Sequence, residues 1–88
     1  MKVYLVYEEG YGDWGIVSSV RKAVEQLIKV DVLYDGTVLW DDLSYDWKSL
    51  VELFGENWKE VISNFSLDEF QKYFDGYLHL YEYDLDDL

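Results

Sequence analysis

The chain has 88 residues, half of them hydrophobic, and its 19 Asp and Glu against 7 Lys and Arg give a formal net charge of −12. A field of this sign repels nucleic acid and anionic membranes and attracts basic proteins, so direct nucleic-acid binding is excluded from our expectations. The absence of Cys rules out disulfides and thiolate metal sites. Without an apolar run of membrane-spanning length or a secretory leader, we expect one soluble, unprocessed cytoplasmic domain over residues 1–88.

The first 29 residues predict strand, turn, strand and helix. Residues 2–8 (KVYLVYE) carry apolar side chains on both faces, as in a central or covered strand. Residues 9–13 have the glycines and acids of a turn, and residues 14–18 form a short second strand of a hairpin. Ser18 or Ser19 then caps a helix that runs to about Lys29. Its apolar stripe has helical spacing and consists of Val20, Ala23, Val24, Leu27 and Ile28.

The middle of the chain predicts a second hairpin followed by helix. In residues 30–40 the Asp35-Gly36 pair lies between β-prone runs, which is a strong signal for a two-residue hairpin turn. From Ser44 onward the apolar residues recur every three or four positions, as on one face of a helix. Gly55 lies inside this pattern, so either one helix with a weak point or two helices with collinear apolar faces would fit. The stripe consists of Trp47, Leu50, Val51, Phe54, Trp58, Val61, Ile62 and Phe65.

The last third predicts a short helix and a terminal strand. Ser66 and Glu69 have the spacing of a capping box, with Leu67, Phe70 and Phe74 turned inward and Gly76 past the end. Residues 77–85 form the last strand, which we place beside the first. The order β-β-α-(β-β)-α-α-β predicts an α+β fold, with a mostly antiparallel sheet of three to five strands and helices packed on one face.

The motifs give no support for catalysis. Gly10, Gly12 and Gly15 have G-x-G-x-x-G spacing, but β-prone residues follow where a dinucleotide site needs a helix, and the neighbouring acids would repel a pyrophosphate. We interpret them as turn glycines that need positive φ. The lone His79, flanked by Leu78 and Leu80, is a packed or surface residue rather than a base or ligand. With no nucleophile elbow and no calcium loop, we expect no catalytic residue, metal or cofactor, and no enzyme activity.

The acidic surface is the main functional signal. Glu52, Glu56 and Glu60 recur at i, i+4, and like charges at this spacing oppose helix formation, so stability does not explain them. They indicate either a surface that mimics nucleic-acid phosphates and occupies a basic groove, or a face that only solubilises the chain. Tyr and Trp beside carboxylates suit a protein interface. The predicted partner-binding residues are Asp41, Asp42, Asp46, Glu52, Glu56, Glu60, Tyr81, Tyr83, Asp84, Asp86 and Asp87.

The aromatic residues of the last strand suggest an alternative function. Tyr77, Tyr81 and Tyr83 share one face of it, with His79 between them. This face either closes the sheet or mediates self-association. The alternative to a charge mimic is therefore a small structural or assembly protein that associates with itself through this strand.

The two ends of the chain, KVYLVYEEGYGDWGIVSSVRKAVEQLI and GYLHLYEYDLDDL, resemble a loose class of short bacterial and phage-carried proteins. Those begin with a strand, a Gly/acid turn and a capped K-A-x-E helix, and end on an acidic strand; residues 30–75 have no counterpart. The resemblance carries over no site residues and no activity. It implies a phage or mobile-element source, and hence an inhibitor, acting in the host cytoplasm as monomer or homodimer, of a basic host nuclease or defence complex, as an anti-CRISPR protein does.

Overall fold

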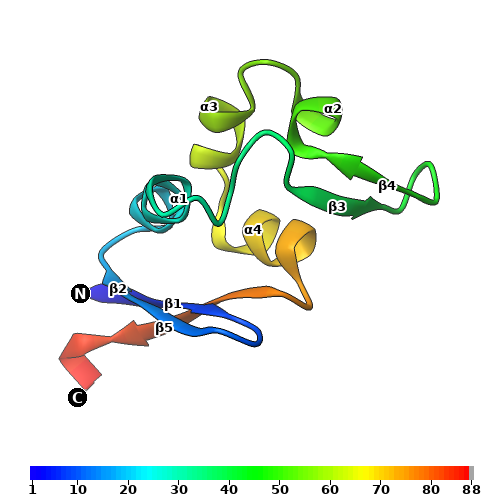
Figure 1. Cartoon of the computed structure of the whole chain (residues 1–88). Helices are drawn as coiled ribbons and strands as arrows, with labels where there is room; N and C mark the ends of the chain where they lie inside the picture. Colours follow the sequence, from blue (N-terminus) through cyan, green and yellow to red (C-terminus); the bar gives the residue numbers. More distant parts are fainter. Residues whose placement is uncertain (88) are drawn as a thin grey trace.

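The computed structural model describes residues 1–87, and the side chain of Asp87 lies outside the described part. The fold of this part of the chain is α+β, as predicted: a three-stranded antiparallel sheet, a separate two-stranded hairpin, four short α-helices and a 3₁₀-helix, η1 (Leu85–Asp87). The helices lie on one side of the three-stranded sheet, and the hairpin extends away from them at one end (Figure 1).

The central strand of the larger sheet is β1 (Lys2–Glu8), as its two apolar faces predict. It pairs antiparallel with β2 (Gly12–Val17) on one side and with β5 (Leu78–Asp84) on the other, which confirms the predicted pairing of the terminal strands. The second strand begins earlier than predicted, since Gly12 already pairs with Glu8. Gly10, Gly12 and Gly15 have φ of 81°, 124° and 109°, so all three have the predicted positive φ and none opens a helix. Only Gly10 lies in the turn, since Gly12 and Gly15 belong to β2.

The first helix, α1 (Val20–Lys29), begins and ends where the sequence predicts. The Ser19 hydroxyl accepts a hydrogen bond from the Lys22 amide (3.1 Å), which satisfies a donor that the first turn leaves free. Ala23, Val24 and Leu27 are fully buried against the sheet and the other helices.

The predicted hairpin over residues 30–40 is wrong. The amides of Val32 and Leu33 both donate to the Leu27 carbonyl (3.0 Å), so this segment terminates α1 instead of pairing as a strand. Asp35 and Gly36 do form a turn, which is closed by the Thr37 amide on the Tyr34 carbonyl (2.9 Å). The residues before the turn do not pair with β3 after it, because the amides of Val32 and Leu33 donate to the helix instead.

The hairpin lies later in the chain. Strand β3 (Val38–Asp41) pairs antiparallel with β4 (Asp46–Ser49), so the prediction of helix from Ser44 is wrong for its first six residues. Helix α2 (Leu50–Phe54) begins at a capping box in which Ser49 and Glu52 each bond the other's backbone amide. Gly55 ends it with φ 84° and ψ −173°, a conformation nearly restricted to glycine, and α3 (Trp58–Ser63) follows. Of the two predicted alternatives, two helices is the one found.

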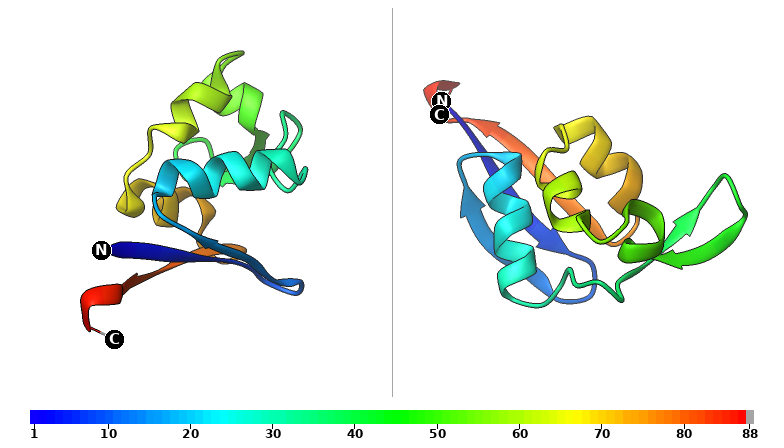
Figure 2. Two further views of the ribbon diagram at one scale, coloured as in Figure 1. Left: turned by 90° about the vertical axis from the view of Figure 1, so that its left-hand side faces the viewer. Right: turned by 90° about the horizontal axis from the view of Figure 1, so that it is seen from above.

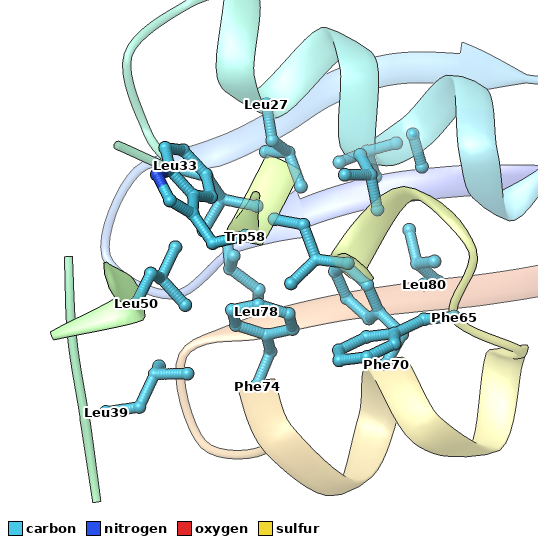
Figure 3. Packing of buried hydrophobic residues seen from close by; sticks show 14 residues of the cluster. Leu27, Leu33, Leu39, Leu50, Trp58, Phe65, Phe70, Phe74, Leu78 and Leu80 are labelled. Carbon is cyan, nitrogen blue, oxygen red and sulfur yellow. The ribbon is translucent and has the colours of Figure 1, made fainter. Parts of the chain in front are cut away.

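Helix α4 (Leu67–Phe74) has the predicted capping box of Ser66 and Glu69, and Gly76 follows it with φ 90°. Its buried side chains, Phe70 and Phe74, make tilted ring contacts in a core to which both the sheet and the helices contribute (Figure 3). From the sheet come Val6, Leu78 and Leu80, while Leu27 of α1, Trp58 and Ile62 of α3 and Leu50 of α2 enter from the helices.

Candidate protein-binding site

The β3–β4 hairpin exposes large apolar side chains at one end of the molecule. Leu43 is 93% exposed, Tyr45 80% and Trp47 62%, and Trp40 is also exposed. Seen from above, the hairpin extends beyond the helices and lies far from both chain ends (Figure 2). Scattered apolar residues are normal on a surface, but a contiguous group that includes two Trp marks an interaction site.

The hairpin holds these residues in a fixed arrangement. Trp40 and Trp47 are directly opposite each other, with an edge-to-face contact and ring centroids 5.3 Å apart. The Asp41 carboxylate accepts hydrogen bonds from the Ser44 hydroxyl (2.7 Å) and the Leu43 amide (3.0 Å), and it pairs with Lys48 (3.3 Å). These contacts, led by the Ser44 hydrogen bond, lower the pKa of Asp41 below its ordinary value. Asp41 therefore stabilises the turn.

We expect the hairpin to loosen in acid because of this carboxylate. The pKa of Asp41 is lower in the folded hairpin than in the unfolded chain, so its contribution is complete above about pH 4 and is lost as the pH falls through the folded value. Tryptophan fluorescence, to which Trp40 and Trp47 contribute two of the four Trp, should show this transition in the wild type when it is recorded from neutral to acid pH. In Asp41→Asn the transition should be absent, and the hairpin should be looser already at neutral pH; an identical acid transition in the variant would contradict the assignment.

A cleft of about 350 Å³ lies beside the hairpin, between it and helices α2 and α4. Its apolar lining includes Trp40, Leu43, Leu53, Phe54 and Tyr73, and its charged lining comprises Asp41, Asp42, Glu52, Lys48 and Lys72. Aromatic rings next to carboxylates can bind a cationic side chain through the ring faces and the charge together. The volume of the cleft is sufficient for one long side chain of a partner, and an Arg can pair with these carboxylates and stack on these rings.

The structure brings only part of the predicted acidic set together. Asp41, Asp42 and Glu52 line the same cleft, and Asp46 lies across the hairpin from Asp41. Glu56 lies in the loop that follows Gly55, and Glu60 is on α3, where it contacts Arg21 (3.6 Å). The row predicted from the i, i+4 spacing is therefore interrupted at Gly55, with its members on different elements.

The remaining predicted residues lie at the other end of the molecule (Figure 1). The carboxylates of Asp84 and Asp86 contact the amino group of Met1 at 3.2 and 2.6 Å. The Asp86 amide and this amino group lower the pKa of Asp84. Tyr81 and Tyr83 lie on the exposed face of β5, and the prediction for Asp87 falls on a side chain outside the described part. These residues do not form one surface with the hairpin.

The sequence analysis does not identify the exposed hairpin residues as a site. The helical spacing predicts a buried Trp47, and no hairpin is then expected around it. The residues concerned are Trp40, Leu43, Tyr45 and Trp47. The capping-box spacing of Ser49 and Glu52 is the signal in the sequence that points to the hairpin. A capping box starts a helix at the residue after its Ser, so it excludes Trp47 from the helix and leaves residues 46–49 free to pair as a strand.

Among the side chains that the structure describes, those of residues 1–86, no group of three or more His, Asp or Glu is arranged to hold a metal ion. No helix in this part of the chain has the length and apolar character needed to cross a bilayer. Comparison with protein-family models, curated proteins and solved structures finds no match to this chain. The resemblance of the two ends to phage-carried proteins stays a prediction.

Proposed function

We propose that this protein is a non-enzymatic acidic binding protein that docks its β3–β4 hairpin on a basic, nucleic-acid-binding protein and competes with the nucleic acid. The observation that carries the proposal is the exposure of two Trp, a Tyr and a Leu on a hairpin whose other side chains include Asp41, Asp42 and Asp46. Aromatic anchors with carboxylates around them suit a partner surface rich in Arg and Lys.

Each part of the site has a separate task in this proposal. Trp40 and Trp47 supply the apolar contact area, since Trp carries more binding energy per residue than most side chains. Asp42 and Glu52, at the cleft, take the positions of two phosphates and pair with basic side chains of the partner. The net charge of −12 accelerates the encounter at low salt and disfavours binding of the protein itself to nucleic acid.

The biological setting follows from the resemblance of the chain ends. We propose a phage or mobile-element protein that acts in the host cytoplasm on a defence nuclease, in the manner of an anti-CRISPR protein. A nuclease of this kind has a basic channel for its nucleic acid, and a hairpin that fills the channel blocks substrate entry without any chemistry.

A competition experiment tests the proposal. The immobilised protein is incubated with nuclease-treated bacterial lysate, and the retained proteins are eluted either with salt steps or with duplex DNA or RNA. We expect basic proteins that leave at raised salt and also in the presence of nucleic acid, because both compete for the same cations. Retained proteins that nucleic acid does not displace would contradict charge mimicry.

Two double variants separate a specific site from general charge. Asp42→Lys with Asp46→Lys changes the hairpin, while Asp13→Lys with Asp68→Lys makes the same change in net charge elsewhere; all four side chains are exposed. We expect the first pair to abolish retention and the second to keep most of it. Equal losses would mean that the acids contribute only overall charge and solubility.

A further inference from the structure

The face of the three-stranded sheet that points away from the helices is uncharged over most of its area. The alternation along β1 places Val3, Leu5 and Tyr7 there, since Val6 points into the core. The register adds Ile16 and Tyr81 beside Leu5, Tyr83 beside Val3 and His79 beside Tyr7. None of these seven residues is Asp, Glu, Lys or Arg, although 30% of the chain is charged. The register places one carboxylate on the face, that of Asp13 beside Tyr7 at the rim. Figures 1 and 2 show that no other element of residues 1–87 covers this face.

The exposed side chains on this face are large and held in place. Ile16 is 66% exposed, Tyr81 44% and Tyr83 45%. The rings of Tyr7, His79 and Tyr81 are in mutual contact, with centroids 5.8 to 6.1 Å apart. Neighbouring rings restrict each other's rotamers, so little side-chain freedom remains to be lost when the face is covered.

We infer that this face binds a second copy of the same chain. The highly acidic remainder of the surface would draw a basic partner elsewhere, because the seven residues offer it no carboxylate. Two copies with a net charge of −12 each approach with least repulsion through a region that carries little charge of its own. This face is such a region, and it lies on a different side of the molecule from the hairpin, so the inference is independent of the proposed function.

The face is complementary to itself about a two-fold axis parallel to β1. Such an axis sets β2 of one copy over β5 of the other, as in aligned packing of two sheets. Ile16 then lies over the other copy's Tyr81, and Leu5 over Leu5. In the next row, Asp13 at the rim lies over the other copy's His79, which provides a polar partner for the nearest carboxylate. The Glu9 carboxylate, 2.8 Å from His79, marks the end of the face.

Sedimentation equilibrium over a range of protein and salt concentrations tests the dimer. Raising the salt from about 0.01 M to about 1 M shortens the Debye length from about 30 Å to about 3 Å and screens the repulsion between copies. We expect the dimer dissociation constant to fall at least about tenfold over this range, whereas retention of a basic partner weakens. A protein that is monomeric at all concentrations and salts, or a dimer that salt dissociates, would overturn the inference.

Two matched substitutions locate the interface. Ile16→Asp and Leu43→Asp each place a carboxylate at an exposed aliphatic position, one on the sheet face and one on the hairpin. Ile16→Asp should weaken dimerisation by about 100-fold or more, since it buries an unpaired charge, and Leu43→Asp should leave it unchanged. Tyr81→Lys is a second variant of the face, to be used if circular dichroism shows that Ile16→Asp is unfolded. A dimer that survives folded Ile16→Asp or Tyr81→Lys, or is lost in Leu43→Asp, would overturn the assignment.

Discussion

Leu27→Ala should lower the free energy of unfolding by about 2–5 kcal/mol and the melting temperature by roughly 10–30 °C. Leu27 has no exposed surface, and in Figure 3 its side chain extends from α1 toward Leu33 and Trp58. Truncation removes apolar burial and leaves a cavity that a layered core of this size fills only in part. Chains of fewer than about 100 residues have little stability in reserve, so the variant should be largely unfolded at physiological temperature. Urea titration followed by circular dichroism measures the loss.

Leu43→Ala is the control for this prediction, because it makes the same chemical change at a side chain that is 93% exposed. Its effect on stability should stay within about 0.5 kcal/mol. If both variants lost the same stability, the core would not be centred on the cluster that contains Leu27.

The double substitution Trp40→Ala with Trp47→Ala should weaken binding of the basic partner by about 100-fold or more at every salt concentration, while the fold persists. The two rings are exposed and contact each other, so their removal takes apolar area from the interface but leaves the core intact. Apolar contacts depend little on ionic strength. The loss should therefore persist at high salt, where the effect of Asp42→Lys with Asp46→Lys becomes small. Titration of the captured partner at several salt concentrations measures both.

The control for the Trp pair is Tyr81→Ala with Tyr83→Ala, which also removes two exposed rings, but from the sheet face. This pair should leave binding of the basic partner unchanged. Equal losses in the two double variants would place the partner on both surfaces and would contradict a site confined to the hairpin.

The terminal thirds of this fold could be predicted from the sequence because their signals are local. Ser19 and the capping box of Ser66 and Glu69 mark the residues at which their helices begin. The long apolar strands at the two ends of the chain are the best pairing partners for each other. These signals depend on a few neighbouring residues, so a tertiary context seldom overrides them.

The middle of the chain could not be predicted, because two periods compete there. Trp47 and Val51 fit a helical stripe, while Trp40 and Trp47 fit a cross-strand pair. The hydrogen bonds of Asp41 in the turn and the capping box of Ser49 and Glu52 decide for the strand. The prediction of the acidic site is wrong in part for the same reason. A continuous row of Glu52, Glu56 and Glu60 requires one uninterrupted helix, and Gly55 ends the helix that contains Glu52.

Ser49 is both the last residue of β4 and the N-cap of α2, so no linker separates the hairpin from the helices. The amides of Leu50 and Val51 also donate to the carbonyls of Thr37 and Asp35, which fastens the base of the hairpin to the turn before it. The hairpin therefore continues directly into α2, and these hydrogen bonds at its base restrict its motion relative to the helices. A partner that meets it encounters the Trp pair already in its final orientation, so the entropy lost on binding is mainly that of bringing two rigid bodies together.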